Sequence, residues 1–165
     1  MKTEHLPSIS VLMSVYNGER WLNESIESIL NQTFKNFEFI IVNDGSNDDS
    51  LDIINSFAKE DSRIRFYDKK NSGLADSLNY GIEKANGEWI ARIDADDICC
   101  LERLEKQFDI VQSNKELVLV GSGLVIIDEN GRHIKVHHYP QKDAWLRKRL
   151  SRAYPFFAHS SAFFK

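Results

Sequence analysis

The chain has 165 residues, of which 42% are hydrophobic and 28% are charged, so it can bury one sizeable core, and we expect a single domain over residues 1–165. Its formal net charge of −4 argues against nucleic acid as a partner, because phosphate neutralisation needs a basic surface. The sequence has no apolar run of about 18 residues and no start typical of a signal peptide, so we expect a cytoplasmic protein.

Short apolar runs alternate with helical patterns along the first two thirds of the chain. Runs rich in β-branched residues predict strands, and apolar residues at 3.6-residue spacing predict helices. Asp48, Asp49 and Ser50 supply cap-type oxygens at the start of the second helix. The strands are expected at residues 9–15, 37–42, 63–67 and 88–94, and the helices at about 21–30, 48–59, 74–85 and 101–112.

The two cysteines and the last third of the chain complete the expected elements. Cys99 and Cys100 are adjacent, which suits neither a zinc site nor an ordinary disulfide, so we expect reduced thiols. Residues 117–127 form one apolar run with glycines in its middle and predict a further strand. The final residues, SSAFFK, resemble a strand interrupted partway, so we expect a chain truncated at its C-terminus.

Four successive strand–helix units predict a mainly parallel sheet that is covered by helices on both faces. Ligands of such sheets bind beyond the carboxyl ends of the strands. Polar residues follow each predicted strand, and we expect them to converge on one rim. They are Ser14, Tyr16 and Asn17; Asn43, Asp44 and Ser46; Asn71, Ser72 and Gly73; and Asp94, Asp96 and Asp97.

The segment ARIDADDI places three acids at the end of the fourth strand. In an extended segment Asp94 and Asp96 share a face, and two carboxylates suit Mn²⁺ or Mg²⁺ held together with the phosphate oxygens of a substrate. Asp97 points the other way, and we expect it to cap the helix that starts near Leu101.

Two long segments, ISVLMSVYNGERWLNESIESILNQTFKNFEFIIVNDGSNDDS and NSGLADSLNYGIEKANGEWIARIDADDI, closely resemble the nucleotide-binding half of glycosyltransferase family 2, from residue 8 to about 128. The resemblance implies a Rossmann-like A-type glycosyltransferase fold. It also implies metal-dependent transfer, with inversion, of a sugar from a UDP-sugar donor to a saccharide or lipid-linked acceptor in cell-surface glycan synthesis.

The resemblance also assigns roles to residues at matching positions. Asp96 would be the principal metal ligand, with Asp94 beside it near the ribose and diphosphate. Asp44 would accept a hydrogen bond from the uracil ring, and Ser14 and Tyr16 would frame the base, Tyr16 by stacking on it. Two alternatives stay open: Asp44 could serve only the turn at Gly45, and Tyr16 could be a core aromatic residue.

The sequence departs from many relatives at one position, where Leu78 rather than arginine precedes Asn79. Neutralisation of the diphosphate charge would then depend more on the metal. Lys69, Lys70 and Arg92 are the candidates for additional positive charge. The general base expected of an inverting enzyme lies beyond Lys165, so we expect the 165-residue chain alone to be inactive. His159 is the first residue to re-examine if it is active.

A basic segment, residues 144–152, combines Trp145 with four arginine or lysine residues. It reads either as an interfacial helix attracted to anionic lipid, which would give peripheral membrane contact, or as a solvated helix face. The four histidines of the C-terminal third lack a metal-ligand pattern; they are His133, His137, His138 and His159.

Three other functions are alternatives to sugar transfer. A nucleotidyltransferase would need a glycine- and arginine-rich phosphate loop after the first strand, which SVYNGERW does not supply, and no G-x-G-x-x-G of a dinucleotide-binding oxidoreductase follows any strand. A non-catalytic nucleotide-binding module stays open, although retention of Asp44, Asp94 and Asp96 argues against a degenerate site.

Overall fold

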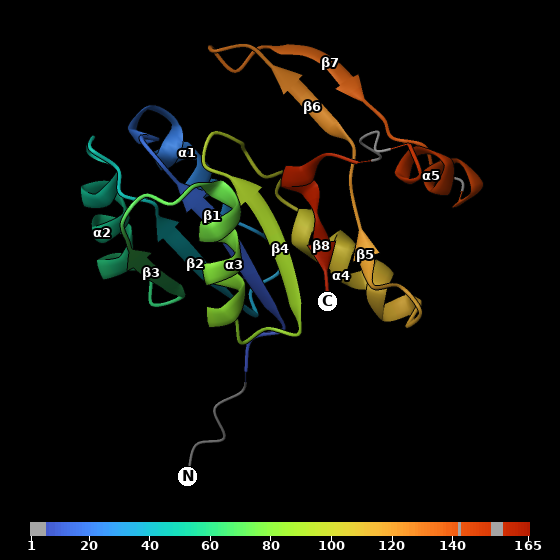
Figure 1. Ribbon diagram of the computed structural model, residues 1–165, viewed down its shortest axis with the longest axis horizontal. Coiled ribbons are helices and arrows are strands. Elements are labelled where there is room, and N and C mark those ends of the chain that lie inside the picture. Colours follow the sequence, from blue (N-terminus) through green and yellow to red (C-terminus); the bar gives the residue numbers. More distant parts are fainter. Residues whose placement is uncertain (1–5, 142, 153–156) are drawn as a thin grey trace.

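The computed structural model describes residues 6–141, 143–152 and 157–165. A six-stranded sheet in the order β3-β2-β1-β4-β8-β5 forms its centre, and a two-stranded sheet of β6 and β7 stands apart from it (Figure 1). The strands are β1 (Ile9–Val15), β2 (Phe37–Asn43), β3 (Ile64–Asp68), β4 (Trp89–Asp94), β5 (Leu119–Val120), β6 (Leu124–Ile127), β7 (His133–His137) and β8 (Phe163–Phe164). The helices are α1 (Glu19–Leu30), α2 (Ser50–Glu60), α3 (Leu74–Lys84), α4 (Arg103–Ser113), α5 (Asp143–Leu150) and the 3-10 helix η1 (His159–Ser161).

The first four strands run parallel, whereas β8 runs antiparallel to both β4 and β5. Each of these parallel strands begins within one residue of its predicted start, because the β-branched runs that predict them are also the buried runs. The predicted parallel α/β sheet is therefore confirmed.

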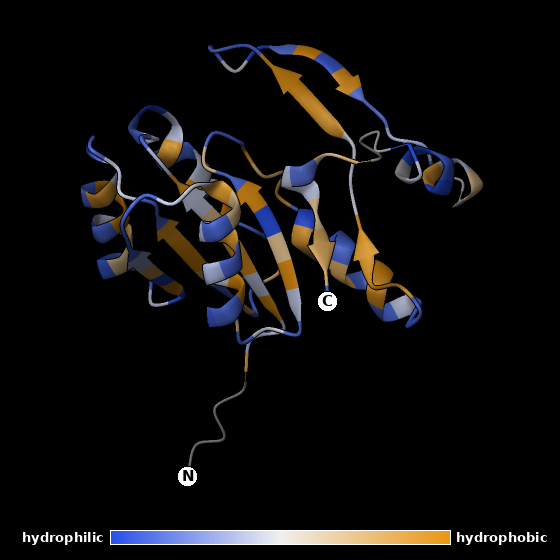
Figure 2. Cartoon of the chain, in the orientation of Figure 1, coloured by the Kyte–Doolittle hydropathy of each residue, from blue (hydrophilic) through white to orange (hydrophobic). Residues whose placement is uncertain are grey.

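Alternating side chains of the strands feed two separate cores, one on each face of the sheet. The larger core packs β1 residues such as Val11 and Met13 against α1, α2 and α4. The smaller core packs Leu12 and Ile40 beneath α3, whose Leu78 covers them. Figure 2 shows these strands as mostly hydrophobic and the outward faces of the helices as hydrophilic. Helices on both faces were expected and are found.

The predicted strand over residues 117–127 is wrong, because the chain breaks at its glycines into β5 and β6. A Cβ on Gly121 would lie 2.8 Å from Cβ of Phe157, so a larger residue here would collide with the Phe157 side chain. The break sends β5 into the main sheet beside β8 and β6 into a hairpin with β7.

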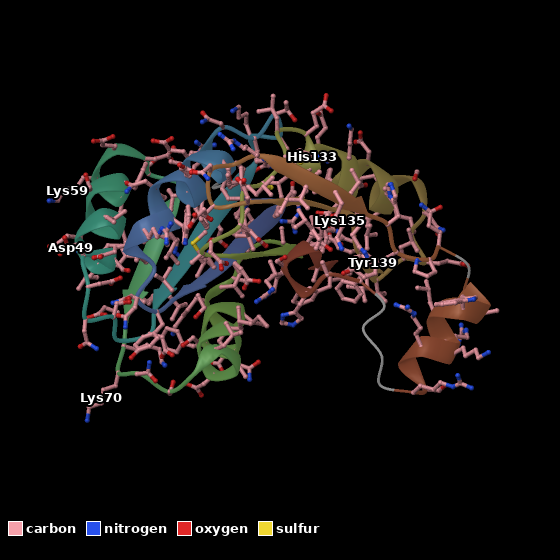
Figure 3. The ribbon with its side chains drawn as sticks, turned by 90° about the horizontal axis from the view of Figure 1, so that it is seen from above. Asp49, Lys59, Lys70, His133, Lys135 and Tyr139 are labelled. Atoms are coloured by element: carbon pink, nitrogen blue, oxygen red, sulfur yellow. The ribbon has the colours of Figure 1, made fainter. Side chains whose placement is uncertain are left out.

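The β6–β7 hairpin lies above the end of the sheet toward which the arrowheads of β1, β2 and β4 point (Figure 1). An exposed ion pair of 3.2 Å joins Glu129 in its turn to Arg20 in the first turn of α1. Seen from above, the hairpin, labelled at His133 and Lys135, lies away from α2, where Asp49 and Lys59 are labelled (Figure 3). The hairpin therefore stands on the same side of the molecule as the strand ends.

Gly81 in α3 sets how closely that helix approaches the sheet, because a Cβ at this position would overlap Cδ1 of Leu12. Leu12 is only 2% exposed, so a shift of its side chain would disturb the packed core around it. We expect Gly81→Ala to lower the free energy of unfolding by about 1–3 kcal/mol in urea titrations, as overpacked cores do. Asn79→Ala, on the exposed side of the same helix, is the control, and an equal loss in both variants would contradict the packing explanation.

Candidate functional site

The carboxyl ends of the parallel strands finish level with one another. Ser14 of β1 pairs in register with Asp94 of β4, and Val15 pairs with Asn43 of β2, which in turn pairs with Asp68 of β3. The polar residues that follow these strands therefore gather at one edge of the sheet, as expected.

A chain of hydrogen bonds ties the loops after the first three strands together. The Asn17 amide donates to Ser46 Oγ at 3.0 Å, and Asn17 Oδ1 accepts from the Asn47 amide at 2.8 Å. Ser46 Oγ donates to Asn43 Oδ1 at 2.6 Å, and Asn43 Nδ2 donates to Asp68 Oδ1 at 2.7 Å. Asn17 adopts a left-handed backbone with φ of 52° to make its two contacts. The rim is thus internally braced.

The side chains of Asp48 and Ser50, which the sequence places at the start of α2, also cap the start of α1. Ser50 Oγ accepts from the Gly18 amide at 2.9 Å, and Asp48 Oδ2 accepts from the Glu19 amide at 3.0 Å. Glu19 in return accepts from the Asp49 amide at 2.9 Å, while Asp49 itself makes no side-chain cap for α2. The two strand-to-helix loops therefore satisfy each other's free backbone amides.

Asp44 sits at the end of β2 with its residue only 2% exposed. Its Oδ1 accepts from Lys69 Nζ at 2.7 Å and from the Ser72 amide at 3.0 Å, and its Oδ2 accepts from the Gly73 amide at 2.9 Å. Burial alone would raise the pKa of this carboxyl, but the bonds from Lys69, Ser72, Ser77 and Gly73 lower it to about 2. Asp44 is therefore an ionised hydrogen-bond acceptor, and its bonds reach well beyond the Gly45 turn.

The three candidate helpers for diphosphate charge differ in how they are engaged. Lys69 forms ion pairs with Asp44 and with Asp76 in the first turn of α3. Arg92 is 4% exposed and forms an ion pair with Asp94, whereas Lys70 is exposed in the loop after β3 (Figure 3). The pairing of Lys69 with Asp44 was missed from the sequence, because the two residues lie 25 positions apart.

Tyr16 is 53% exposed immediately beyond β1, so it is not a core aromatic residue. Ser14, two residues earlier, is partly buried and level with Asp94. Tyr16 therefore presents an aromatic ring to solvent at the rim on which Asp44 and Asp94 lie.

Asp94 ends β4 and accepts hydrogen bonds from the buried guanidinium of Arg92 through both carboxylate oxygens, with Arg92 Nη1 at 3.0 Å from Oδ2. Partial burial raises the pKa of Asp94, Arg92 opposes that rise, and the nearby Asp97 and Asp96 carboxylates add to it. Arg92 Nε has no hydrogen-bond partner among the described residues. Asp94 is thus fixed in orientation while its side chain stays 36% exposed.

The chain turns directly after Asp94, because the Asp97 amide donates to the Asp94 carbonyl at 3.2 Å. The extended geometry expected for residues 94–96 is therefore wrong beyond the strand end. The capping role expected of Asp97 is also wrong: α4 starts at Arg103, with Glu102 at its N-cap position and no side-chain cap. Asp96 lies exposed in the turn, and within the described parts of the chain no hydrogen bond to its carboxylate is found.

These acids fit an open site for a divalent cation. Among residues 6–141, 143–152 and 157–165, no group of three or more histidine, cysteine or acidic residues is placed to enclose a metal. Asp96 offers an uncommitted carboxylate, and Asp94 keeps free lone pairs beside its Arg92 bonds. Mg²⁺ in proteins is commonly coordinated by one or two carboxylates, and water and phosphate oxygens fill its remaining coordination positions.

The remaining expectations from the sequence concern the cysteines, His159 and the basic segment. Both cysteines are free, as expected, and burial raises the pKa of the Cys99 thiol. His159 is exposed in η1, next to β8, which pairs with β4. The basic segment forms α5, and none of the helices in the described chain is both long and apolar enough to cross a bilayer. The single domain and the cytoplasmic location stay predictions.

The arrangement of sheet, helices and rim is that of solved glycosyltransferases. A mannosyltransferase from Pyrobaculum calidifontis aligns with 98% of this chain and 45% of its own at a TM-score of 0.71 and 20% identity, which shows the shared fold. Residues 1–349 of Staphylococcus aureus TarS, solved in complex with UDP-GlcNAc, align with 78% of this chain and 37% of that protein at a TM-score of 0.62 and 25% identity. The A-type glycosyltransferase fold implied by the resemblance is therefore confirmed.

The chain belongs to glycosyltransferase family 2, whose family model matches residues 10–164. It is 36% identical over 171 residues to the Escherichia coli O-antigen biosynthesis glycosyltransferase WbnJ, covering 100% of this chain and 64% of that protein. It is 44% identical over 127 residues to the Bacillus subtilis putative glycosyltransferase EpsE, covering 76% and 46%. The chain thus spans less than two thirds of either relative. Membership of this family sets aside the nucleotidyltransferase and oxidoreductase alternatives.

The low pKa of Asp44 predicts an acid-sensitive contribution to stability. Because the folded pKa of about 2 lies below the ordinary 3.8, the ionised carboxylate stabilises the fold above pH 3.8, and this contribution is lost as the pH falls toward 2. We expect Asp44→Asn to lower the free energy of unfolding by about 1–2 kcal/mol at neutral pH. Urea titrations at falling pH should show the difference from wild type shrinking, and a constant difference would contradict the assignment. Asp109→Asn, on the exposed face of α4, is the control.

Proposed function

We propose that this chain is the donor-binding part of a metal-dependent glycosyltransferase that uses a UDP-sugar. The observation that carries the proposal is the convergence, at one rim, of an ionised acceptor at Asp44, an exposed ring at Tyr16 and the carboxylates of Asp94 and Asp96. These groups correspond to the base, the sugar-phosphate and the metal of one extended nucleotide ligand.

The base end of the site favours uracil. A base stacked on Tyr16 gains about 1–3 kcal/mol, and Asp44, which can only accept hydrogen bonds, favours a ring N–H donor. Uracil offers such a donor at N3, and guanine offers one at N1, whereas the corresponding ring nitrogens of cytosine and adenine are acceptors. The UDP-GlcNAc in the TarS structure supports uracil as the preferred base.

The diphosphate end is assigned to the acids after β4. Asp96 would be the principal ligand of Mn²⁺ or Mg²⁺, and Asp94, oriented by Arg92, would lie beside the ribose and diphosphate. The cation, when bound, neutralises charge on the diphosphate as it leaves the sugar. Ser14, level with Asp94, would frame the base together with Tyr16.

The transfer step would invert the anomeric carbon. An acceptor hydroxyl oxygen forms a bond to that carbon as the bond to the diphosphate oxygen breaks, and the hydroxyl proton passes to a carboxylate base. We assign no described residue to that base. The O-antigen relative supports a saccharide or lipid-linked acceptor and a role in polysaccharide synthesis.

The decisive experiment measures binding of UDP, GDP, CDP and ADP by calorimetry with and without Mn²⁺. We expect metal-dependent binding with UDP tightest. Asp96→Asn should remove the manganese-dependent part of UDP binding and leave the melting temperature without ligand unchanged, because relief of like-charge repulsion does not destabilise the fold. Asp109→Asn serves as the matched control. An unchanged manganese effect in Asp96→Asn would rule out the metal role of this residue.

We also propose that α5 gives the protein peripheral contact with an anionic membrane surface. The basic segment, residues 144–152, carries four basic residues and no acidic residue in a chain whose net charge is −4. Trp145 is 49% exposed, and Arg149 lies 4.8 Å from the centre of its ring. A cavity of about 260 Å³ is lined by Trp145, Lys148, Arg149 and Arg152. A tryptophan flanked by cations suits a bilayer interface.

Cosedimentation with vesicles tests this contact. We expect binding to phosphatidylglycerol-containing vesicles, weaker binding at high salt and no binding to pure phosphatidylcholine. Reversing two charges with Lys148→Glu and Arg152→Glu should weaken binding by roughly tenfold or more, at about 1 kcal/mol per basic residue. The same charge change at Lys59 and Lys70, which lie on the far side of the molecule from α5, is the control (Figure 3). Equal loss in both double variants would show a general charge effect and overturn the proposal.

A further inference from the structure

Lys69 occupies an unusual place for a lysine beside a ligand rim, because its side chain is only 18% exposed and its ammonium group lies inside a ring of acceptors. Nζ donates to Asp44 Oδ1 at 2.7 Å, to the Lys70 carbonyl at 3.1 Å and to Ser77 Oγ at 3.3 Å, and it also contacts Ser72 Oγ. One ammonium group therefore joins the end of β2, the loop after β3 and the first turns of α3.

The loop that Lys69 braces, residues 69–73, folds over Asp44. Ser72 and Gly73 each donate a backbone amide to its carboxylate. From the other side, a Cβ at Gly45 would lie only 2.8 Å from the Asn71 amide nitrogen, so the turn after β2 packs directly on this loop. Asp76 adds a second ion pair to Lys69, with Oδ2 at 3.3 Å. The loop and the carboxylate thus form one unit around a single cation.

This arrangement treats the two oxygens of Asp44 differently. Oδ1 receives the lysine and the Ser72 amide, the Gly73 amide bonds to Oδ2, and the Ser77 hydroxyl also bonds to the carboxylate. The ring N–H of a base would therefore have to join a carboxylate that already accepts several bonds, so the orientation of that carboxylate decides whether the N–H can bond to it. Lys69 contributes the charged member of the set that fixes this orientation, together with the Ser72 and Gly73 amides.

We propose that Lys69 is a positioning residue for the nucleobase: by holding Asp44 and the 69–73 loop, it sets the preference of the site for bases with a ring N–H donor. This inference rests on the proposed function of the same site. It differs from a phosphate-binding role, because the ammonium group is turned toward Asp44 and Asp76 and its charge is already neutralised by them.

The test compares Lys69→Met, Lys69→Arg and the control Lys59→Met, at an exposed lysine of α2, with wild type. Calorimetry with Mn²⁺ measures dissociation constants for UDP, GDP, CDP, ADP and pyrophosphate, and circular dichroism with melting curves confirms folding. We expect Lys69→Met to weaken UDP by about tenfold, the effect of disturbing one hydrogen bond to a charged group, and to leave pyrophosphate within about twofold. Lys69→Arg, which keeps a cationic donor, should retain most of the preference for UDP, and Lys59→Met should retain all of it.

A pH series adds a readout that loss of folding does not mimic. Without its cation, the buried Asp44 carboxyl should have a higher pKa. The affinity of Lys69→Met for UDP, divided by its affinity for pyrophosphate at the same pH, should therefore fall as the pH drops from about 7 to about 4. Wild type should stay flat over that range, because its Asp44 pKa of about 2 lies below it.

The outcomes separate this inference from the proposed function. A wild type that prefers GDP but loses that preference in Lys69→Met would change the proposed donor and support Lys69. Equal weakening of UDP and pyrophosphate in a folded Lys69→Met would assign the residue to the phosphates and overturn the inference, as would an unchanged UDP preference. A wild type that binds no nucleotide would overturn both.

Discussion

Parallel hydrogen bonding of β1 to both β2 and β4 is the constraint on which the rest of the structure depends. The two registers pair Val15 with Asn43 and the preceding Ser14 with Asp94, although β1, β2 and β4 come from different thirds of the first hundred positions. Helices on both faces then bury the strands and leave their carboxyl ends as the surface where polar side chains can meet. Slipping either register by one residue would turn the alternating side chains to the opposite faces and separate these groups.

Two carboxylates of the rim are each held by a cation that lies behind them in the protein. Lys69 holds Asp44, and Arg92 holds Asp94 from within β4. Such pairs cost desolvation when they form, and breaking one leaves a charge without its partner. Each pair also fixes the orientation of its carboxylate. Asp96 has no such support among the described residues and remains free for a ligand. The rim therefore combines fixed acceptors with one adaptable carboxylate.

The sequence predicts those parts of the fold that short-range pattern controls. The strand at 9–15 is a short apolar run that includes β-branched residues, and the acids after β4 stand out because three like charges close together repel one another. The misses have physical causes. β7 alternates polar and apolar residues over only five positions, HIKVH, and all five are exposed, so no buried run marks it. The split at Gly121 depends on Phe157, far along the chain. The pairing of Lys69 with Asp44 is likewise a contact between distant positions, which no local spacing reveals.

The position of β8 has a consequence for how the chain acquires its fold during synthesis. Phe163 pairs with Ala91 of β4 on one side and with Val120 of β5 on the other, and its ring stacks on Trp89 at 5.3 Å. A ribosome makes β4 and β5 well before the strand that belongs between them. Until that strand emerges, the outer edge of β4 carries unpaired backbone groups beside exposed aromatic surface, which is an open template for pairing with another nascent chain.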